Sequence, residues 1–221
     1  MGDFRPETSD VDLLAVTERG VSDAEFASLV ALHSSIAEQP HPFAMRLEIA
    51  YIDRAALRRF QPGFRFPTLG QGAGETLIWA EHHTNWILER WTVREHGMIL
   101  FGPPPNELID PIAPAEIVAA VQARVQVWAE WASDLTNPEW QAPRSHKAYV
   151  VETMCRALYT MAQGEIASKA HSVAWARQNL PEPWRTLVEH SQRWHTDNTV
   201  DHTLIPRVQA FVLWSAQCLI L

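Results

Sequence analysis

A run of three prolines divides this 221-residue chain into two halves of different character. Residues 100–105 read Leu-Phe-Gly-Pro-Pro-Pro. Consecutive prolines lack backbone N–H donors and are stiff, so a helix does not continue through them. Strand and helix patterns alternate before this segment, whereas only helical patterns follow it. We therefore predict an α+β fold: an N-terminal domain with a mixed sheet and helices over residues 1–104, followed by an all-α helical bundle over residues 105–221.

Local patterns define the elements of the first half. Apolar alternation predicts strands, and clusters of Gly and Pro predict a loop. Trp79 and Trp86 are seven residues apart, which places them on one face of the last expected helix. His33, His82 and His83 fall on expected helices without metal-ligand spacing, so we expect them at the surface. In order, the elements are a strand beginning near Asp10, a helix between Ser22 and Pro40, a strand over residues 47–52, a short helix or turn over residues 55–60, a loop over residues 61–74 and a helix over residues 75–95.

Each helix expected in the second half has a recognisable start or stop. Pro114 suits a first helical turn, where no N–H donor is needed. Ser145 and Ser168 are N-cap residues, and Gly164 and Pro181 follow helix ends. The expected helices run from Pro114 through Trp131, from Ser145 to before Gly164, from Ser168 to before Pro181, over residues 184–194 and over residues 206–219.

Composition argues against several classes of partner. The formal net charge of −8 and a sequence pI near 5.7 argue against nucleic-acid binding, which needs clustered Lys and Arg. The apolar run over residues 211–221 is too short to span a bilayer, and the first twenty residues lack the pattern of a secretory signal. Cys155 and Cys218 form neither a metal motif nor a disulfide framework. We expect a reduced cytoplasmic protein with no nucleic-acid or membrane partner.

Two carboxylates lie close together near the start of the chain. Alternate residues of a strand share a face, so Asp10 and Asp12 point the same way while Val11 and Leu13 point to the other side. Like charges this close are costly to ionise together, and Mg²⁺ removes that penalty while it binds substrate phosphates. An isolated Asp-x-Asp is more often an acidic turn before a strand, so the surrounding sequence decides between the two interpretations.

The sequence around this pair resembles a known family. Residues 2–14 form a turn-rich segment that leads into an apolar strand, as in nucleotidyltransferases of the DNA polymerase β superfamily, whose motif is Gly-Ser, a spacer and Asp-x-Asp. The resemblance extends to the streptomycin and spectinomycin adenylyltransferases of aminoglycoside resistance. The Gly-Ser and the strand leading into it are absent before Asp10, so an N-terminally truncated member is expected. Further stretches that carry the resemblance are residues 46–52, 96–103, 153–159, 164–169 and 175–176.

The resemblance implies a polymerase β-like mixed sheet and the transfer of AMP from ATP to a substrate hydroxyl. The family carries a third carboxylate on a neighbouring strand, and Glu48 takes this position here. Asp10, Asp12 and Glu48 would then hold Mg²⁺, and Glu48 would also be the catalytic base that takes the hydroxyl proton. Without the aspartate pair, Glu48 would be interpreted as a strand carboxylate that faces solvent.

The same resemblance assigns nucleotide-binding residues. Ser9 is retained beside the aspartates. Lys169 lies at the N-terminal end of a predicted helix, where the dipole is already positive, and this placement suits an anion between the two. The family uses a lysine here for the triphosphate, although an ordinary solvated lysine is the alternative. His195 lies near the position where the family places an aromatic residue on the nucleotide. Arg156 either contacts phosphate or forms a structural salt bridge.

The acceptor is expected to be a small molecule, a cationic aminoglycoside or aminocyclitol, bound by a monomer. Drug-modifying members carry an acidic residue ten positions before the arginine matched by Arg156. This position is His146 here, and we assign it to substrate binding. Trp128, Trp131 and Trp140 could line an acceptor pocket, although core positions are the commoner role of such residues.

Three functions remain open on the sequence alone. The first is an ATP- and Mg²⁺-dependent O-adenylyltransferase of the aminoglycoside-resistance type. The second keeps this chemistry but uses a protein or another metabolite as the acceptor. The third is a truncated, non-catalytic nucleotide-binding remnant.

Overall fold

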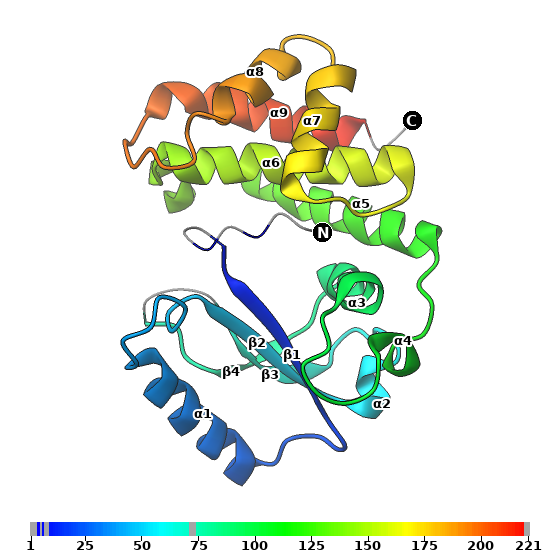
Figure 1. Ribbon diagram of the computed structural model, residues 1–221. Helices are drawn as coiled ribbons and strands as arrows, with labels where there is room; N and C mark the ends of the chain where they lie inside the picture. The colour runs from blue at the N-terminus through cyan, green and yellow to red at the C-terminus, as the bar shows by residue number, and fades with distance from the viewer. Residues whose placement is uncertain (1–3, 5, 7–8, 71–73, 219–221) are drawn as a thin grey trace. The chain divides into compact units, whose positions relative to one another are not determined.

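The structure is a computed structural model that describes residues 4, 6, 9–70 and 74–218 (Figure 1). These residues form two compact units, which divide between Pro111 and Ile112. The first unit contains a mixed sheet with helices, and the described part of the second contains helices without strands. This organisation confirms the predicted α+β class with a helical C-terminal half.

The first unit is built on a four-stranded sheet. Its strands, in their order across the sheet, are β1 (Val11–Thr17), β2 (Leu47–Asp53), β3 (Arg65–Leu69) and β4 (Ile78–Glu81). β1 and β2 are parallel, and the other neighbours are antiparallel. A parallel pair needs a crossover connection, which α1 (Asp23–Ala37) provides. Within the described part of the chain, β1 is therefore an edge strand beside β2.

Helices cover both faces of this sheet (Figure 1). On one face α1 packs on β2, where His33 Nε2 lies 2.8 Å from the hydroxyl oxygen of Tyr51. On the other face α3 (Asn85–His96) contributes Trp86, whose ring stacks on that of His82 with the centroids 3.4 Å apart. The buried residues between these layers form the core of the first unit.

The structure differs from the prediction between the end of β2 and the end of α3. The expected loop contains β3, and the expected helix over residues 75–95 is split into β4, a turn and α3. Cross-strand pairing of β3 with both β2 and β4 overrides the local helical pattern. Trp79 and Trp86 therefore do not share a helix face, because Trp79 stacks on Phe26 of α1 while Trp86 packs on the opposite side of the sheet.

Two of the three histidines expected at the surface are buried. His33 is 6% exposed and His82 is 1% exposed, whereas His83 is exposed as expected. His82 follows β4, and its Nε2 lies 3.0 Å from the hydroxyl oxygen of Thr68. Burial, with smaller contributions from the charges of Arg90 and His83, lowers the pKa of His82 to about 3. His82 is thus a neutral core residue of the sheet unit.

Arginine side chains attach the segment after the proline run to the sheet unit. Arg94 Nη1 donates to the carbonyl oxygen of Asn106 at 3.0 Å. Arg58 and Arg59 donate to the two carboxylate oxygens of Asp110 at 2.9 and 2.7 Å. These contacts explain why the first compact unit extends to Pro111. The two short helices of this unit are α2 (Arg54–Leu57) and α4 (Pro105–Leu108).

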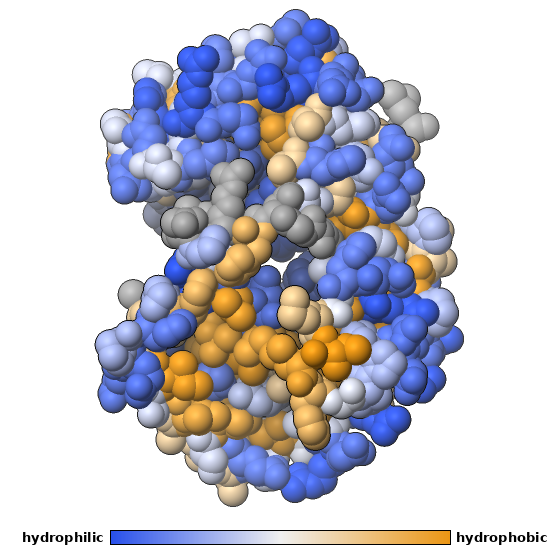
Figure 2. All heavy atoms as spheres, in the orientation of Figure 1, coloured by the Kyte–Doolittle hydropathy of each residue, from blue (hydrophilic) through white to orange (hydrophobic). Residues whose placement is uncertain are grey.

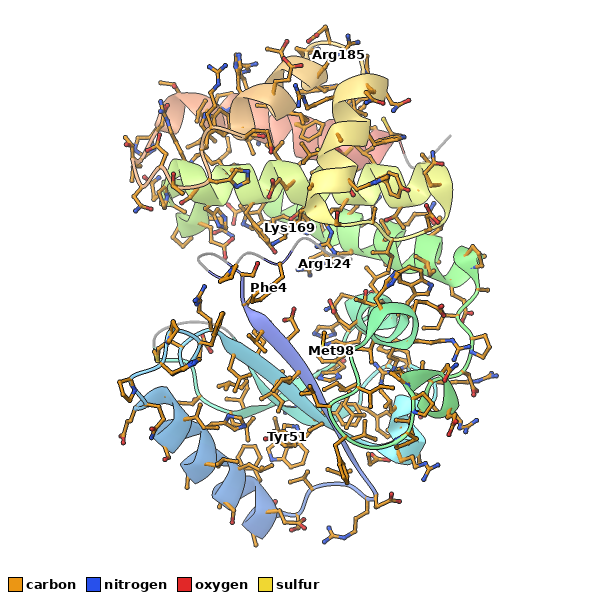
Figure 3. The ribbon with its side chains drawn as sticks, viewed as in Figure 1. Phe4, Tyr51, Met98, Arg124, Lys169 and Arg185 are labelled. Atoms are coloured by element: carbon orange, nitrogen blue, oxygen red, sulfur yellow. The ribbon has the colours of Figure 1, made fainter. Side chains whose placement is uncertain are left out.

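An exposed apolar segment connects α3 to α4. Met98, Leu100 and Phe101 are 87%, 76% and 99% exposed. Figure 2 shows apolar residues gathered on the side of the sheet unit that faces the viewer, and Met98 is labelled in Figure 3. This segment therefore contributes to the surface of the sheet unit rather than to its core.

The second unit is a bundle arranged around α6 (Arg144–Gln163). α6 packs against the four other long helices of the unit, and most of its residues are buried. It ends at Gly164, whose φ of 72° is the left-handed conformation that a residue without Cβ adopts readily. The hydroxyl of Ser168 accepts a hydrogen bond from the His171 N–H at 3.2 Å and caps the next helix. The other elements are α5 (Pro114–Ser133), the 3₁₀ turn η1 (Pro138–Gln141), α7 (Lys169–Asn179), α8 (Trp184–Ser191), the 3₁₀ turn η2 (His202–Leu204) and α9 (Ile205–Gln217).

The N-cap of α6 is Pro143, two residues before the predicted cap at Ser145. The N–H groups of Arg144 and Ser145 donate to the carbonyl oxygens of Thr199 and Asp197 at 2.9 and 3.0 Å, so a distant loop satisfies these donors. The last expected helix corresponds to α9, and its predicted end at Leu219 lies outside the described residues. Within the described part of the chain, no helix has both the length and the apolar character that a bilayer crossing requires.

Candidate functional site

Three carboxylates gather where the two parallel strands begin. Asp12 on β1 is the register partner of Glu48 on β2, and Asp10 lies immediately before β1. One oxygen from each of the three side chains lies within 4.8 Å of the other two. Asp10 and Glu48 are half-buried, and Asp12 is exposed. The fold therefore brings together the three side chains that the sequence assigned to one metal site.

The carboxylate cluster fits a hard divalent cation. Carboxylate oxygens are preferred ligands of Mg²⁺, and two oxygens bound to one Mg²⁺ at about 2.1 Å lie at most about 4.2 Å apart. The three carboxylate oxygens lie within 4.8 Å of one another, close to this separation. A cation would also offset the mutual repulsion of three neighbouring negative charges. Asp10, Asp12 and Glu48 are thus suitable ligands for Mg²⁺.

Arg46 fixes the chain segment that leads into β1. Its guanidinium donates to three carbonyl oxygens: those of Ser9 at 3.0 Å, Pro6 at 2.9 Å and Pro42 at 3.0 Å. Ser9, which the sequence assigned to the nucleotide, directly precedes Asp10 on this segment. This role of Arg46 is not visible in the sequence, because its partners are backbone carbonyls as far as 40 residues away and no side-chain pattern indicates them.

The other four assigned residues, His146, Arg156, Lys169 and His195, lie in the helical unit. Lys169 is the exposed first residue of α7 and is labelled in Figure 3. Arg156 is half-buried on α6. Within the described residues, neither of these two cations has an ion-pair partner, so Arg156 shows no sign of the structural salt bridge that was its alternative role.

His195 pairs with a buried carboxylate. Its Nε2 lies 3.0 Å from Oε1 of Glu152 on α6. Glu152 is 8% exposed, whereas the His195 side chain is 42% exposed. A carboxylate on one ring nitrogen fixes the orientation of an imidazole. Glu152 was not predicted as a site residue, although a lone acidic residue within an otherwise apolar stretch of a helix is a usable signal.

His146 lies on the first turn of α6 among aromatic rings. Its ring centroid is 6.5 Å from that of Trp131 and 6.0 Å from that of Tyr149. Burial lowers the pKa of His146, an effect that outweighs the opposing charge of Glu139. The imidazole is therefore neutral at physiological pH.

Comparison with known proteins relates the helical unit to a protein family. Residues 107–215 match a protein-family model described as the C-terminal domain of aminoglycoside adenylyltransferase. The helical unit of this chain is therefore similar to the C-terminal domain of the aminoglycoside adenylyltransferase family. The matched residues run from the end of α4 through most of α9, so the C-terminal domain of these adenylyltransferases corresponds to the helical unit.

Individual adenylyltransferases match over part of their length. The aminoglycoside (3'')(9) adenylyltransferase of Klebsiella pneumoniae is 30% identical over 98 residues, which cover 43% of this chain and 33% of that protein. A protein of the same name from Rhizobium radiobacter is 27% identical over 109 residues, which cover 49% of this chain and 37% of that protein. The matched segment thus spans about a third of the length of these relatives.

A solved adenylyltransferase structure shares the fold of both units. Spectinomycin adenyltransferase AAD(9) from Enterococcus faecialis, crystallised with ATP and spectinomycin, superposes with a TM-score of 0.71. The superposition covers 96% of this chain and 85% of that chain at 14% sequence identity. At this identity the comparison concerns the fold, and it supports the predicted nucleotidyltransferase architecture.

Proposed function

We propose that this protein is a Mg-ATP-dependent nucleotidyltransferase that transfers AMP to a hydroxyl group of an aminoglycoside-like small molecule. The observation that carries the proposal is the gathering of Asp10, Asp12 and Glu48 at the start of two parallel strands. The names of the matched relatives support the acceptor class, and the ATP in the AAD(9) crystal supports the donor. Because ATP is the donor, we place the reaction in the cytoplasm. We also propose that the enzyme acts as a monomer.

The sheet unit supplies positioning and charge neutralisation in this proposal. Phosphoryl-group transfer leaves little covalent chemistry to the protein, so orientation and electrostatics provide the rate. When bound, Mg²⁺ neutralises charge on the phosphates. Asp10 and Asp12 hold this charge in place, and Arg46 holds the backbone from which Asp10 projects.

Glu48 is the proposed catalytic base. The acceptor hydroxyl oxygen attacks the α-phosphorus of ATP, the bond from that phosphorus to pyrophosphate breaks, and the hydroxyl proton passes to the Glu48 carboxylate. A hydroxyl is a weak nucleophile until it is deprotonated, so a base within hydrogen-bond reach is required. The position of Glu48 opposite Asp12 in the strand register supports this role.

The helical unit supplies binding groups in this proposal. Lys169 and Arg156 bind the negative charge of the triphosphate, and the N-terminus of α7 adds a favourable dipole beside Lys169. His195, oriented by Glu152, contacts the nucleotide. His146 contributes to acceptor binding among the aromatic rings around it.

The proposal is tested with purified protein, ATP, Mg²⁺ and either streptomycin or spectinomycin. We expect pyrophosphate release and an acceptor whose mass has increased by one adenylyl group, both abolished by a chelator and by Glu48→Gln. Glu18→Gln is the matched control, because Glu18 follows β1 and its side chain is 88% exposed. Metal-dependent ATP binding without any modified acceptor would reject the acceptor class. Failure to bind ATP in the presence of Mg²⁺ would reject the transferase itself.

A further inference from the structure

One arginine at the start of α6 binds two aspartates that lie far away in the sequence. Arg144 Nη1 donates to Oδ2 of Asp197 at 3.0 Å, and Arg144 Nε and Nη2 donate to Oδ2 of Asp201 at 3.1 and 2.7 Å. These partners follow Arg144 by 53 and 57 residues, and both lie on the loop between α8 and η2. The three side chains are here termed the Arg144 network.

Each aspartate of the Arg144 network also binds its own loop. Asp197 Oδ1 accepts from the N–H of Thr199 at 2.9 Å, and Asp201 Oδ1 accepts from the N–H and the hydroxyl of Thr203 at 2.9 and 2.6 Å. The hydroxyl of Thr203 and the guanidinium of Arg144 lower the pKa of Asp201 to about 2, so this carboxylate is charged at physiological pH. Each carboxylate therefore joins the loop backbone to the same guanidinium.

Backbone hydrogen bonds join the same two segments. The N–H groups of Arg144 and Ser145 donate to the carbonyl oxygens of Thr199 and Asp197 at 2.9 and 3.0 Å. The first N–H groups of a helix have no acceptor within the helix, and the N-cap residue Pro143 provides no side-chain acceptor for them. The loop carbonyls supply this missing acceptor. The loop and the start of α6 therefore hold each other through both side chains and backbone.

The loop held in this way carries His195. Trp194 is 8% exposed, whereas the side chain of the next residue, His195, is 42% exposed and can reach a ligand. Glu152, whose Oε1 lies 3.0 Å from His195 Nε2, is on α6 about 12 Å along the helix axis from Arg144. α6 therefore holds His195 at two separate points: Arg144 holds its loop, and Glu152 holds its imidazole.

Such a double attachment affects ligand binding more than core packing. A half-exposed imidazole contributes little to a core, so a fixed orientation is of use chiefly to a ligand. A binding group that is already in its bound geometry loses less conformational entropy when the ligand arrives. If the loop were free, His195 would be correctly placed in only a fraction of the molecules, and the apparent Kd would rise by the inverse of that fraction.

We propose that Arg144 is a positioning residue for nucleotide binding, because the Arg144 network fixes the loop that presents His195 to the nucleotide. The inference rests on the proposed transferase function, in which His195 contacts ATP. Arg144 itself contacts no reacting atom in this role and acts only through His195. Loss of Arg144 should therefore weaken ATP binding without slowing the chemical step.

The first test measures Mg-ATP binding to the whole chain by calorimetry, at a temperature where every variant is folded. Arg144→Gln should weaken ATP binding about three- to tenfold and raise KM for ATP equally, with kcat nearly unchanged. Arg144→Lys should lie between the two, because an ammonium is a point charge that cannot reproduce the guanidinium geometry.

Arg185→Gln is the matched control in the same unit. Arg185, labelled in Figure 3, pairs with Glu182 and donates to the carbonyl oxygen of Leu180, outside the loop that carries His195. Its ATP affinity should stay within about twofold of wild type, because an exposed ion pair contributes little. Amide hydrogen exchange at Thr199 should become faster in Arg144→Gln and stay unchanged in Arg185→Gln.

A double variant separates positioning from a purely structural role. If Arg144 acts through His195, then Arg144→Gln should have almost no further effect on ATP affinity in a chain that already carries His195→Asn. A general loss of structure would weaken ATP binding by the same factor in both backgrounds. Equal factors, or a folded Arg144→Gln variant that binds ATP as wild type does, would overturn the inference.

The transferase function and this inference fail in different ways. If the ATP affinities follow the expected pattern but no AMP is transferred to streptomycin or spectinomycin, the inference stands and the transferase function is rejected. If AMP is transferred and KM for ATP is insensitive to Arg144→Gln, the inference alone is rejected. Wild-type protein that binds no ATP in the presence of Mg²⁺ would overturn both.

Discussion

Asp12 and Glu48 stand directly opposite each other as register partners on the parallel strands β1 and β2. The pairing projects both carboxylates to one face of the sheet, and Asp10, two residues earlier, joins them within 4.8 Å. Like charges directly opposite one another on neighbouring strands are destabilising. The arrangement therefore makes physical sense as a ligand set whose repulsion a cation relieves.

Asp12→Asn separates the catalytic role of this cluster from its effect on stability. The variant removes one metal-binding charge, so AMP transfer should fall at least about 100-fold and half-saturation by Mg²⁺ should need at least about tenfold more metal. Because Asp12 is exposed, the thermal midpoint should not fall, and the loss of charge repulsion should raise it slightly. Steady-state assays across Mg²⁺ concentrations, with Glu18→Gln alongside, check this. Unchanged Mg²⁺ dependence would exclude Asp12 as a ligand.

Arg46→Ala tests whether the segment before β1 must be held for catalysis. The substitution leaves the carbonyl oxygens of Ser9, Pro6 and Pro42 without this donor, so stability should fall by about 1–3 kcal/mol. The backbone at Asp10 is then no longer held in place, so AMP transfer should fall about tenfold. The assay is run well below the melting temperature, where the variant is still folded and lost stability does not lower the rate. Arg59→Ala, which removes an exposed surface ion pair to Asp110, is the control. Equal activity of the two variants would contradict a positioning role for Arg46.

Glu152→Gln tests the partner of His195. The amide keeps the shape of Glu152 but removes the charge that orients the imidazole 3.0 Å away. We expect KM for ATP to rise about three- to tenfold with kcat nearly unchanged, because the change affects nucleotide binding rather than the reacting atoms. His195→Asn should have a similar effect, and the double variant should be no worse than either single one, since coupled residues are not additive. Additive effects would show that the two side chains act separately.

The sequence predicted those features of the fold and site that depend on local residue patterns or on the resemblance to a known family. The Asp10–Asp12 alternation, the left-handed end of α6 at Gly164 and the cap at Ser168 are all set by neighbouring residues. β3 and β4 were missed, because their conformation depends on pairing with neighbouring strands, which overrides the local helical and loop patterns.

Side-chain interactions between residues that are distant in sequence could not be predicted either, because they form only when the chain folds. Arg46 donates to backbone carbonyl groups, which every residue carries, so no sequence pattern indicates its role. Glu152 finds His195 only after α6 has packed in the bundle. The burial of His82 likewise depends on a strand turn that the helical pattern of residues 75–95 conceals.

His82 makes the stability of the sheet unit pH-dependent. Its pKa is about 3 in the folded protein, chiefly because it is buried, and about 6.5 in an unfolded chain. Between these values the unfolded chain binds a proton that the folded protein does not. Stability from this group is therefore complete above about pH 6.5 and is lost as the pH falls toward about 3, by about 2 kcal/mol at about pH 5.

His82→Gln removes this titration, so comparing the variant with wild type separates the contribution of His82 from those of the other histidines. The variant should be less stable at every pH, because the ring stacked on Trp86 and its contact with Thr68 are lost. Its unfolding free energy should nevertheless fall less steeply between about pH 6.5 and 5 than that of wild type. His33 and His146, whose pKa values burial also lowers, remain and leave a residual slope. Urea unfolding across this range measures both curves, and parallel curves would show that folding does not lower the pKa of His82.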